Sequence, residues 1–214
     1  KMVNINIHEP VMLGEVKKFI PVTKKINIID ATFGGGGYSK ALLEEYNVNQ
    51  LIAIDRDPIS KIFSSELEKK YPDKFNLVNG CFSQIDKLIN LKHINNRNSI
   101  KFDIIIFDLG LSSNQLEDSQ RGFSFLKEGP LNMSMGQSKL LASDIINSYS
   151  EKELSDIIFK FGEERHAKKI AKSIVKYRKL KVIKTTLELS KLVSKNIPKT
   201  KLKKINPATK TFQA

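Results

Sequence analysis

The sequence is poor in the residues that build disulfide, zinc and membrane-spanning structures. Its 214 residues include one cysteine, Cys81, and three widely separated histidines, His8, His93 and His166. One cysteine excludes a disulfide framework and a multi-cysteine zinc site, and the histidines lack metal-ligand spacing, so we expect no metal. The longest strongly apolar run, FDIIIF at residues 102–107, falls far short of the ~18 residues of a membrane span. The first residues also lack the apolar core of a signal peptide, so we expect a cytoplasmic protein without a membrane partner.

Charge is unevenly distributed along the chain. Residues 1–150 hold 18 Lys or Arg against 17 Asp or Glu, whereas residues 151–214 hold 18 against 6. Within residues 165–214 the only acid is Glu188, against 16 basic residues. A near-neutral part joined to a strongly basic part predicts a ligand-binding or catalytic unit beside one that binds a polyanion such as nucleic acid. The alternative is a lysine-rich composition in which most lysines are simply solvated.

Short apolar runs alternate with helical patterns over the first 110 residues. The pattern predicts helices at residues 38–46, 58–71 and 83–90, and strands at residues 26–30, 50–55, 75–80 and 101–108. The last of these runs, KFDIIIFD, is largely apolar, as strands covered on both faces are. The alternation implies right-handed crossovers and a parallel sheet. The predicted fold class is therefore α/β, with a parallel, doubly wound, Rossmann-like core.

After Asp108 the pattern changes to a long polar loop followed by helices. Ser150 with Glu153, and Thr185 with Glu188, have the spacing of capping boxes that begin helices. Residues 164–178 place apolar side chains on one helical face and basic ones on the other. The sequence therefore predicts a small helical domain that follows the fourth strand.

A glycine-rich stretch, DATFGGGG at residues 30–37, follows the first predicted strand and opens a helix. Glycines let backbone N–H groups approach a ligand closely, and a helix N-terminus favours negative charge. The stretch differs from the dinucleotide fingerprint G-x-G-x-x-G, because Ser39 stands at the third glycine position and Asp30 would repel a pyrophosphate. An acid there suits a ligand with a cationic end, such as S-adenosylmethionine. A plain glycine turn is the structural alternative.

Three more candidate residues lie at or just beyond the ends of predicted strands. Asp55 ends the second strand, where a carboxylate accepts both hydroxyls of a ribose or is simply solvated. Phe82 follows the third strand, where it contacts an adenine or fills the core. Asp108 ends the fourth strand and is the best catalytic candidate, since a group there can hold a target amine with its lone pair aimed at a methyl donor. Cys81 is interpreted as a buried structural thiol.

Seven stretches together carry a resemblance to a known family. They are HEPVML (residues 8–13), DATFGGGGYS (30–39), AIDRDP (53–58), FDLGLSSNQLEDSQRGFSF (107–125), GPLNMSM (129–135), FGEERHAKKIAKSI (161–174) and NPATKTFQA (206–214). In combination they resemble the bacterial ribosomal RNA small-subunit methyltransferase H family over nearly the whole chain. The resemblance implies a class I methyltransferase fold that uses S-adenosylmethionine. It also implies methylation of the exocyclic N(4) of a cytosine in the decoding region of 16S rRNA, in the small ribosomal subunit.

The resemblance also assigns site residues. Carried over position by position, it places cofactor contacts at Gly36, Gly37, Tyr38, Asp55, Phe82, Asp108 and Gln115. Two places depart from the family pattern. Tyr38 replaces the usual histidine, so its contact would be through the backbone, and NMSM at residues 132–135 replaces D-M-R-M.

A domain plan follows from the same comparison. We expect residues 1–114 to form an S-adenosylmethionine-binding core, residues 115–205 an inserted helical RNA-binding domain, and residues 206–214 the start of a return to the core. Because the family continues beyond this point, we expect a C-terminally truncated member with an incomplete sheet. Two basic groups are expected to line an RNA-binding cleft: Arg165, Lys168, Lys169, Lys172 and Lys176, and then Lys199, Lys201, Lys203 and Lys204.

Two other functions remain open. The first is a catalytically inactive RNA-binding fragment that keeps the basic helices. The second is a nicotinamide-dependent oxidoreductase, which Asp30 and the missing third glycine disfavour.

Overall fold

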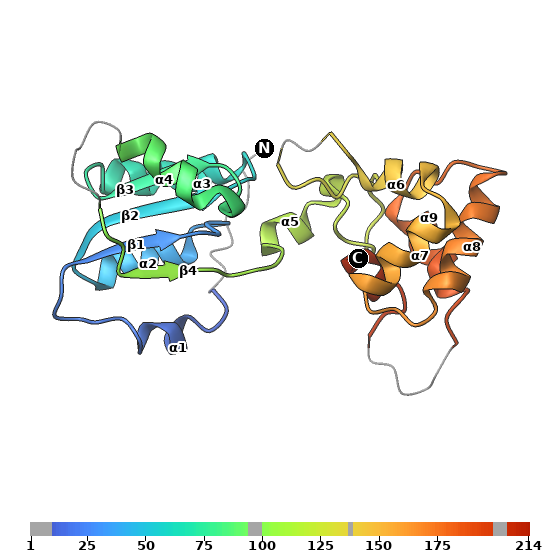
Figure 1. Cartoon of the computed structure of the whole chain (residues 1–214), viewed down its shortest axis with the longest axis horizontal. Helices are drawn as coiled ribbons and strands as arrows, with labels where there is room; N and C mark the ends of the chain where they lie inside the picture. Colours follow the sequence, from blue (N-terminus) through green and yellow to red (C-terminus); the bar gives the residue numbers. More distant parts are fainter. Residues whose placement is uncertain (1–9, 94–99, 137–138, 199–204) are drawn as a thin grey trace. The chain divides into compact units, whose positions relative to one another are not determined.

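The computed structural model describes residues 10–93, 100–136, 139–198 and 205–214, with side chains left out at residues 90–93. The chain divides into two compact units (Figure 1). The first unit comprises residues 1–112 and 135–137, and the second comprises residues 113–134 and 138–214. Among the described residues, every helix is too short or too polar to span a bilayer.

The first unit contains a four-stranded, all-parallel sheet in the order β3-β2-β1-β4. Its strands are β1 (Ile26–Asp30), β2 (Val48–Asp55), β3 (Phe75–Asn79) and β4 (Ile104–Ile106). The chain steps from β1 to β2 and β3 in one direction and then returns to β4 on the other side of β1 (Figure 1). This reversal creates a switch point beyond the carboxyl ends of β1 and β4, the place where open α/β sheets bind ligands. The predicted Rossmann-like α/β core is confirmed.

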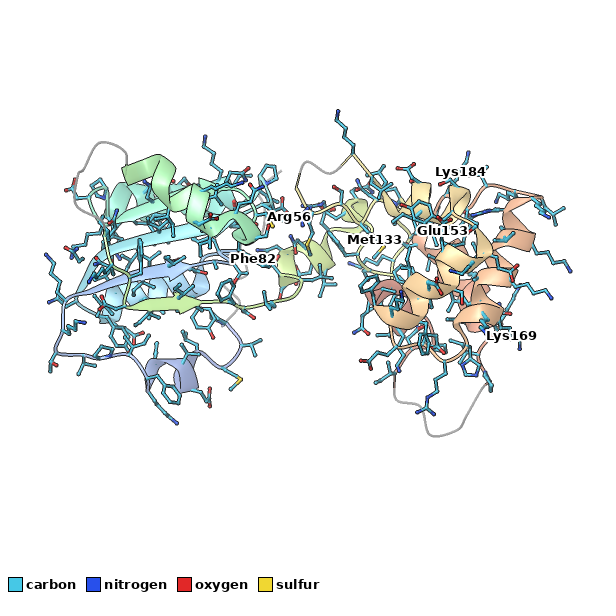
Figure 2. The ribbon with its side chains drawn as sticks, viewed as in Figure 1. Arg56, Phe82, Met133, Glu153, Lys169 and Lys184 are labelled. Carbon is cyan, nitrogen blue, oxygen red and sulfur yellow. The ribbon has the colours of Figure 1, made fainter. Side chains whose placement is uncertain are left out.

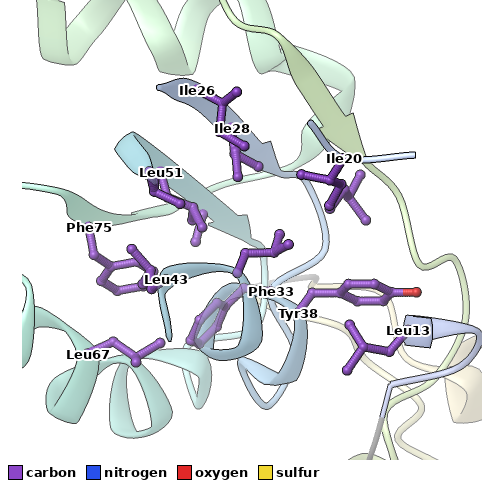
Figure 3. Packing of buried hydrophobic residues seen from close by; sticks show 14 residues of the cluster. Leu13, Ile20, Ile26, Ile28, Phe33, Tyr38, Leu43, Leu51, Leu67 and Phe75 are labelled. Carbon is purple, nitrogen blue, oxygen red and sulfur yellow. The ribbon is translucent and has the colours of Figure 1, made fainter. Parts of the chain in front are cut away.

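Helices cover both faces of this sheet because its strands bury side chains on both sides. The helices are α1 (Leu13–Lys17), α2 (Gly37–Glu45), α3 (Ser60–Lys70), α4 (Ile85–His93) and the short 3-10 helix η1 (Phe82–Gln84). On one face, Ile28 and Leu51 pack with Leu42 of α2 in a cluster that also includes α1 and α3 (Figure 3). On the other face, Ile29 packs with Leu88 of α4. The core is therefore doubly wound, as the direction of the crossovers requires.

The N-terminal segment is fastened to α2 by two tyrosine hydroxyls. Tyr38, in the first turn of α2, donates to the carbonyl of Val11, and Tyr46, at its end, donates to the carbonyl of Lys17 at 3.0 Å. Leu13 adds an apolar contact to the same cluster. The segment before the first strand is thus held at both ends of the helix that follows the glycine-rich stretch.

The second unit is helical. Its elements are α5 (Ser113–Glu117), η2 (Ser119–Arg121), α6 (Ala142–Ser148), α7 (Glu151–Lys160), α8 (Ala167–Arg178), α9 (Thr186–Ser194) and α10 (Thr209–Gln213). Both predicted capping boxes are present, since Ser150 and Glu153 exchange hydrogen bonds at the start of α7, as Thr185 and Glu188 do at the start of α9. Helices α6 to α10 share one apolar core.

The end of the chain belongs to this second core. Ala208 and Phe212 are buried in it, and the Phe212 ring packs edgewise on Phe125 with centroids 4.9 Å apart. A Cβ at Gly162 would lie 2.2 Å from the carbonyl oxygen of Lys210, so α10 closes directly on the turn after α7. Residues 206–214 therefore contribute two apolar side chains to the helical core of the second unit. That they begin a return to the first unit stays a prediction.

Candidate functional site

The loops after all four strands meet at the carboxyl edge of the sheet in the first unit. Backbone hydrogen bonds tie them together there: Ala31 donates to Ile106 at 2.9 Å, and Phe33 donates to Ile54 at 3.0 Å. The loop after β3 is held by Gly80, which donates to Asp55 at 2.8 Å. The candidate residues from these loops consequently share one edge.

The glycine-rich stretch needs glycine at residues 34 and 36 for its conformation. Gly34 and Gly36 have φ of +54° and +81°, a region that other residues rarely adopt. A Cβ at Gly36 would also lie 2.7 Å from the Phe33 ring. Gly36 precedes the first turn of α2, where the N–H groups of Gly37 and Tyr38 have no acceptor within the helix. The stretch therefore presents the backbone donors of a helix start.

Asp30 is a buried carboxylate that holds this stretch in place. It is 1% exposed, and its oxygens accept from the Ser39 hydroxyl at 2.7 Å and from the Thr32 N–H at 3.3 Å. Burial, with smaller contributions from the nearby carboxylates of Asp55 and Asp108, raises the pKa of Asp30 from 3.8 to about 6, although the hydrogen bonds from Ser39 and Thr32 oppose the change. Asp30 thus supplies negative charge from beneath the loop. Ser39, which the sequence marks only as a missing glycine, is its hydrogen-bond donor.

Asp55 lies at the end of β2 and faces the glycine-rich stretch. Its two carboxylate oxygens accept from the N–H groups of Gly34 at 2.7 Å and Asp57 at 2.8 Å. Burial raises its pKa, although these backbone bonds oppose the change. Each carboxylate oxygen retains a second lone pair. Asp55 is therefore half-buried and oriented, with acceptor capacity left for the hydroxyls of a ribose.

Asp108 leaves the end of β4 toward the same edge. Its side chain is exposed, and its N–H donates to the Thr32 hydroxyl at 2.7 Å. Its charge contributes to raising the pKa of both Asp30 and Tyr38, which places it near both. Three carboxylates, those of Asp30, Asp55 and Asp108, therefore gather at the switch point. Thr32, which links the loops after β1 and β4, carries no sequence signal that distinguishes it from an ordinary loop residue.

Phe82 forms an aromatic wall rather than part of the core. It is 38% exposed, and its ring packs edgewise on Phe107 with centroids 5.6 Å apart and an interplanar angle of 84°. Figure 2 places Phe82 and Arg56 at the carboxyl edge of the sheet. Phe82 therefore does not fill the core, and its contact with an adenine stays a prediction. Phe107, the partner ring, is one residue before Asp108 and is indicated only by its position at the strand end.

Tyr38 contributes only its backbone to the glycine-rich stretch. Its ring is 6% exposed within the apolar cluster, and its hydroxyl points toward the N-terminal segment, where Val11 accepts its hydrogen bond (Figure 3). This geometry explains how tyrosine occupies the position: its side chain is used for packing, and its N–H stays at the start of α2.

Two more residues that the sequence analysis names are Gln115 and Cys81. Gln115, the seventh predicted contact, is on α5 of the second unit. Cys81 is half-exposed rather than buried, because it lies at the start of η1, where the Ser83 hydroxyl donates to its sulfur at 3.2 Å. This bond lowers the pKa of the thiol. Among the described residues, no three His, Cys, Asp or Glu side chains are grouped in a way that could hold a metal ion.

The chemistry of this edge fits one class of ligand. Three carboxylates suit a cationic group and disfavour the pyrophosphate of a dinucleotide. The oriented carboxylate of Asp55 suits the hydroxyls of a ribose, and the exposed rings of Phe82 and Phe107 suit an aromatic base. The backbone donors at the start of α2 suit a carboxylate. S-adenosylmethionine combines a sulfonium and an ammonium cation with a carboxylate, a ribose and an adenine. The residues present therefore fit this group.

Comparison with known proteins agrees with that fit. Residues 5–214 match the MraW methylase family. Relatives named ribosomal RNA small subunit methyltransferase H include one from Neorickettsia sennetsu, 44% identical over 97% of this chain and 67% of its own length. Others are from Wolbachia sp. subsp. Drosophila simulans, 44% identical over 97% and 69%, and Ehrlichia canis, 42% identical over 97% and 68%. The chain spans about two thirds of the length of these relatives. Methyltransferases of this fold generally use S-adenosylmethionine, and with this match over nearly its whole length the chain belongs to the MraW methylase family.

Proposed function

We propose that this chain transfers a methyl group from S-adenosylmethionine to the exocyclic N(4) of a cytosine in the decoding region of 16S rRNA. The observation that carries the proposal is the convergence of Asp30, Asp55 and Asp108 around the glycine-rich stretch at the switch point. The names of the relatives support small-subunit rRNA as the substrate.

Residues of the first unit would hold the cofactor by complementary chemistry. Asp55 would accept the ribose hydroxyls, and Phe82 would contact the adenine. The N–H groups of Gly37 and Tyr38 would face the carboxylate of the amino-acid end, next to Gly36, whose own N–H donates to the Phe33 carbonyl at 2.8 Å. When bound, S-adenosylmethionine supplies an electrophilic methyl group beside a sulfonium.

Asp108 would act on the target amine. Its exposed carboxylate can accept a hydrogen bond from the exocyclic N–H of a cytosine, which orients the amine and leaves the nitrogen lone pair free. The bond from its N–H to Thr32 fixes the backbone from which the carboxylate projects. An amine needs no covalent enzyme intermediate, so proximity and orientation are the main contributions expected from the protein.

Two substitutions test these roles separately. Asp55→Ala should weaken S-adenosylmethionine binding by about 1.5–3 kcal/mol in calorimetry, the scale of hydrogen bonds to a charged acceptor. Asp108→Asn should lower single-turnover methylation of small-subunit rRNA far more than it lowers RNA affinity. Asp73→Asn, an exposed acid in the turn before β3, is the matched control and should change neither quantity.

Each result has a contrary outcome. Unchanged cofactor affinity in Asp55→Ala would remove Asp55 from the site, and unchanged turnover in Asp108→Asn would leave Asp108 as an ordinary strand-end residue. Stabilisation of the chain by NAD would favour the oxidoreductase, against which the three carboxylates argue.

The second candidate function is an RNA-binding fragment without activity. It is favoured by the separate basic helices of the second unit, which need no cofactor to bind RNA. RNA binding without methyl transfer by the purified chain, at saturating S-adenosylmethionine, would select it.

A further inference from the structure

Helix α8 has two chemically opposite faces. Its buried face consists of Ala167, Ile170, Ala171 and Ile174, each at most 2% exposed. At 3.6 residues per turn, the opposite face carries a stripe about 100° wide. This stripe, called the α8 stripe below, consists of Arg165, just before the helix, Lys168, Lys169, Lys172, Lys176 and Lys179, just after it, all exposed.

Helix α8 itself carries no acid beside the α8 stripe, and the nearest acids in the sequence are Glu163 and Glu164, before Arg165. The sequence of α8, AKKIAKSIVKYR, contains no Asp or Glu. Between described residues, no ion pair or hydrogen bond engages the side chains of the stripe. Helix α7, in contrast, carries Glu151, Glu153 and Asp156 beside its lysines. The stripe is therefore a concentration of uncompensated positive charge on one surface.

Other cations of the second unit are already engaged in the fold. The Arg178 guanidinium caps α6 by donating to the carbonyls of Ile146 at 2.7 Å and Tyr149 at 2.5 Å. Lys181 pairs with Glu188 at 2.6 Å. Arg178 and Lys181 therefore serve the fold, whereas the side chains of the α8 stripe are not used in this way within the described part of the chain.

We propose that the α8 stripe is the surface on which the second unit binds the phosphate backbone of its RNA substrate. This inference rests on the proposed function and adds the place and the mode of RNA binding. Apart from the adjacent Lys168 and Lys169, successive members of the stripe are three or four residues apart, about 5–6 Å along the helix surface. That spacing suits successive phosphates of one strand. Lysines are flexible point charges, so the stripe binds without reading the base sequence. Figure 2 shows Lys169 directed away from the other helices of the unit.

Salt dependence tests the proposal on the complete chain. The variant Lys168→Gln/Lys172→Gln/Lys176→Gln removes three charges from the stripe without touching the helical core. At ~0.7 per phosphate for single strands, the slope of log K against log[salt] should fall by about 2. Equal affinities at 1 M salt then imply a loss of about 100-fold at 0.1 M. The probe is small-subunit rRNA transcribed in vitro.

A control of equal charge comes from the same unit. Lys152→Gln/Lys181→Gln/Lys191→Gln also removes three lysines, two of which are paired with Asp156 and Glu188. It should reduce the slope by much less than the stripe variant. Both variants should bind S-adenosylmethionine as the wild type does, which also shows that the first unit remains folded.

The outcomes separate this inference from the proposed function. An unchanged slope in the stripe variant, an equal loss in the control, or stripe-dependent binding to anionic phosphatidylserine vesicles but not to RNA would overturn the inference. Stripe-dependent RNA binding without methyl transfer by the wild type would uphold the inference while the proposed activity fails. Lys199, Lys201, Lys203 and Lys204, the second predicted basic group, lie outside the described residues, and the test does not depend on them.

Discussion

Stability and ligand binding make opposite demands on Asp30. Its carboxyl is buried, and burial raises its pKa from 3.8 to about 6. At 1.36 kcal/mol per pH unit, this rise corresponds to about 3 kcal/mol of folding free energy lost when the group ionises. Asp30→Asn replaces the carboxylate with a neutral group of the same shape that still accepts the Thr32 N–H, and the Ser39 hydroxyl can rotate to accept from the amide. We expect a stabilisation of about 2 kcal/mol at pH 7.5, with the full 3 as its ceiling.

The pH dependence has a defined sign. Because the folded-state pKa of Asp30 is raised, its penalty is absent below 3.8, grows as the pH rises to about 6, and is constant above that value. The advantage of Asp30→Asn over the wild type should therefore appear between about pH 4 and pH 6 and then level off. The same substitution should weaken S-adenosylmethionine binding, since it removes one of the carboxylates that favour a cation.

Urea unfolding at several pH values, followed by a probe in the first unit, measures this difference. Asp103→Asn is the control, because Asp103 is bound by Lys24 and by the Asn27 N–H, and the bond to Lys24 lowers its pKa. Asp103 contributes to the free energy of unfolding above its ordinary pKa, and this contribution is lost as the pH falls. Asp103→Asn should therefore destabilise the first unit at neutral pH. If Asp30→Asn were no more stable than the wild type at pH 7.5, or equally more stable at pH 4, the assignment of a costly buried charge would be refuted.

Two more substitutions test one contact inside the first unit and one inside the second. Tyr38→Phe removes the hydroxyl that donates to the Val11 carbonyl but keeps the buried ring. The free energy of unfolding should therefore fall by about 0.5–1.5 kcal/mol, while the cofactor affinity measured by calorimetry stays the same. A loss of cofactor affinity would show that the hydroxyl or the N-terminal segment acts at the site. Gly162→Ala places a Cβ 2.2 Å from the Lys210 carbonyl oxygen and should destabilise the second unit by about 1–3 kcal/mol in urea unfolding. Gly14→Ala, in helix α1 with open space around it, should instead stabilise the first unit by up to about 1 kcal/mol, because alanine loses less backbone entropy in a helix. Equal destabilisation by the two substitutions would contradict the close approach of α10.

The sequence predicts those features that depend on local pattern. Alternating apolar runs predict the parallel sheet, and the Ser150 and Thr185 capping boxes predict two helix starts. Asp55 was predicted from its place at a strand end, and it faces the glycine-rich stretch as that place requires.

Features that depend on contacts between distant residues were beyond the sequence pattern. The edge-to-face pair of Phe82 and Phe107 depends on β3 and β4 lying on opposite sides of β2 and β1 while their loops meet at one edge. The packing of residues 206–214 depends on the space left beside Phe125 and Gly162. No local periodicity encodes either of these distances.

The carboxylate-bearing edge of the sheet and the α8 stripe carry charges of opposite sign, and this has a consequence for catalysis. An edge with three carboxylates attracts a cationic methyl donor but repels the phosphates of the RNA that must approach it. Affinity for RNA therefore has to come from another surface, and the α8 stripe supplies positive charge that forms no ion pair within the part of the chain that the structure describes. On this reasoning, salt should weaken methylation mainly through RNA binding, raising KM and leaving kcat at saturating RNA nearly constant. A fall in kcat with salt at saturating RNA would show instead that the charges act on the chemical step itself.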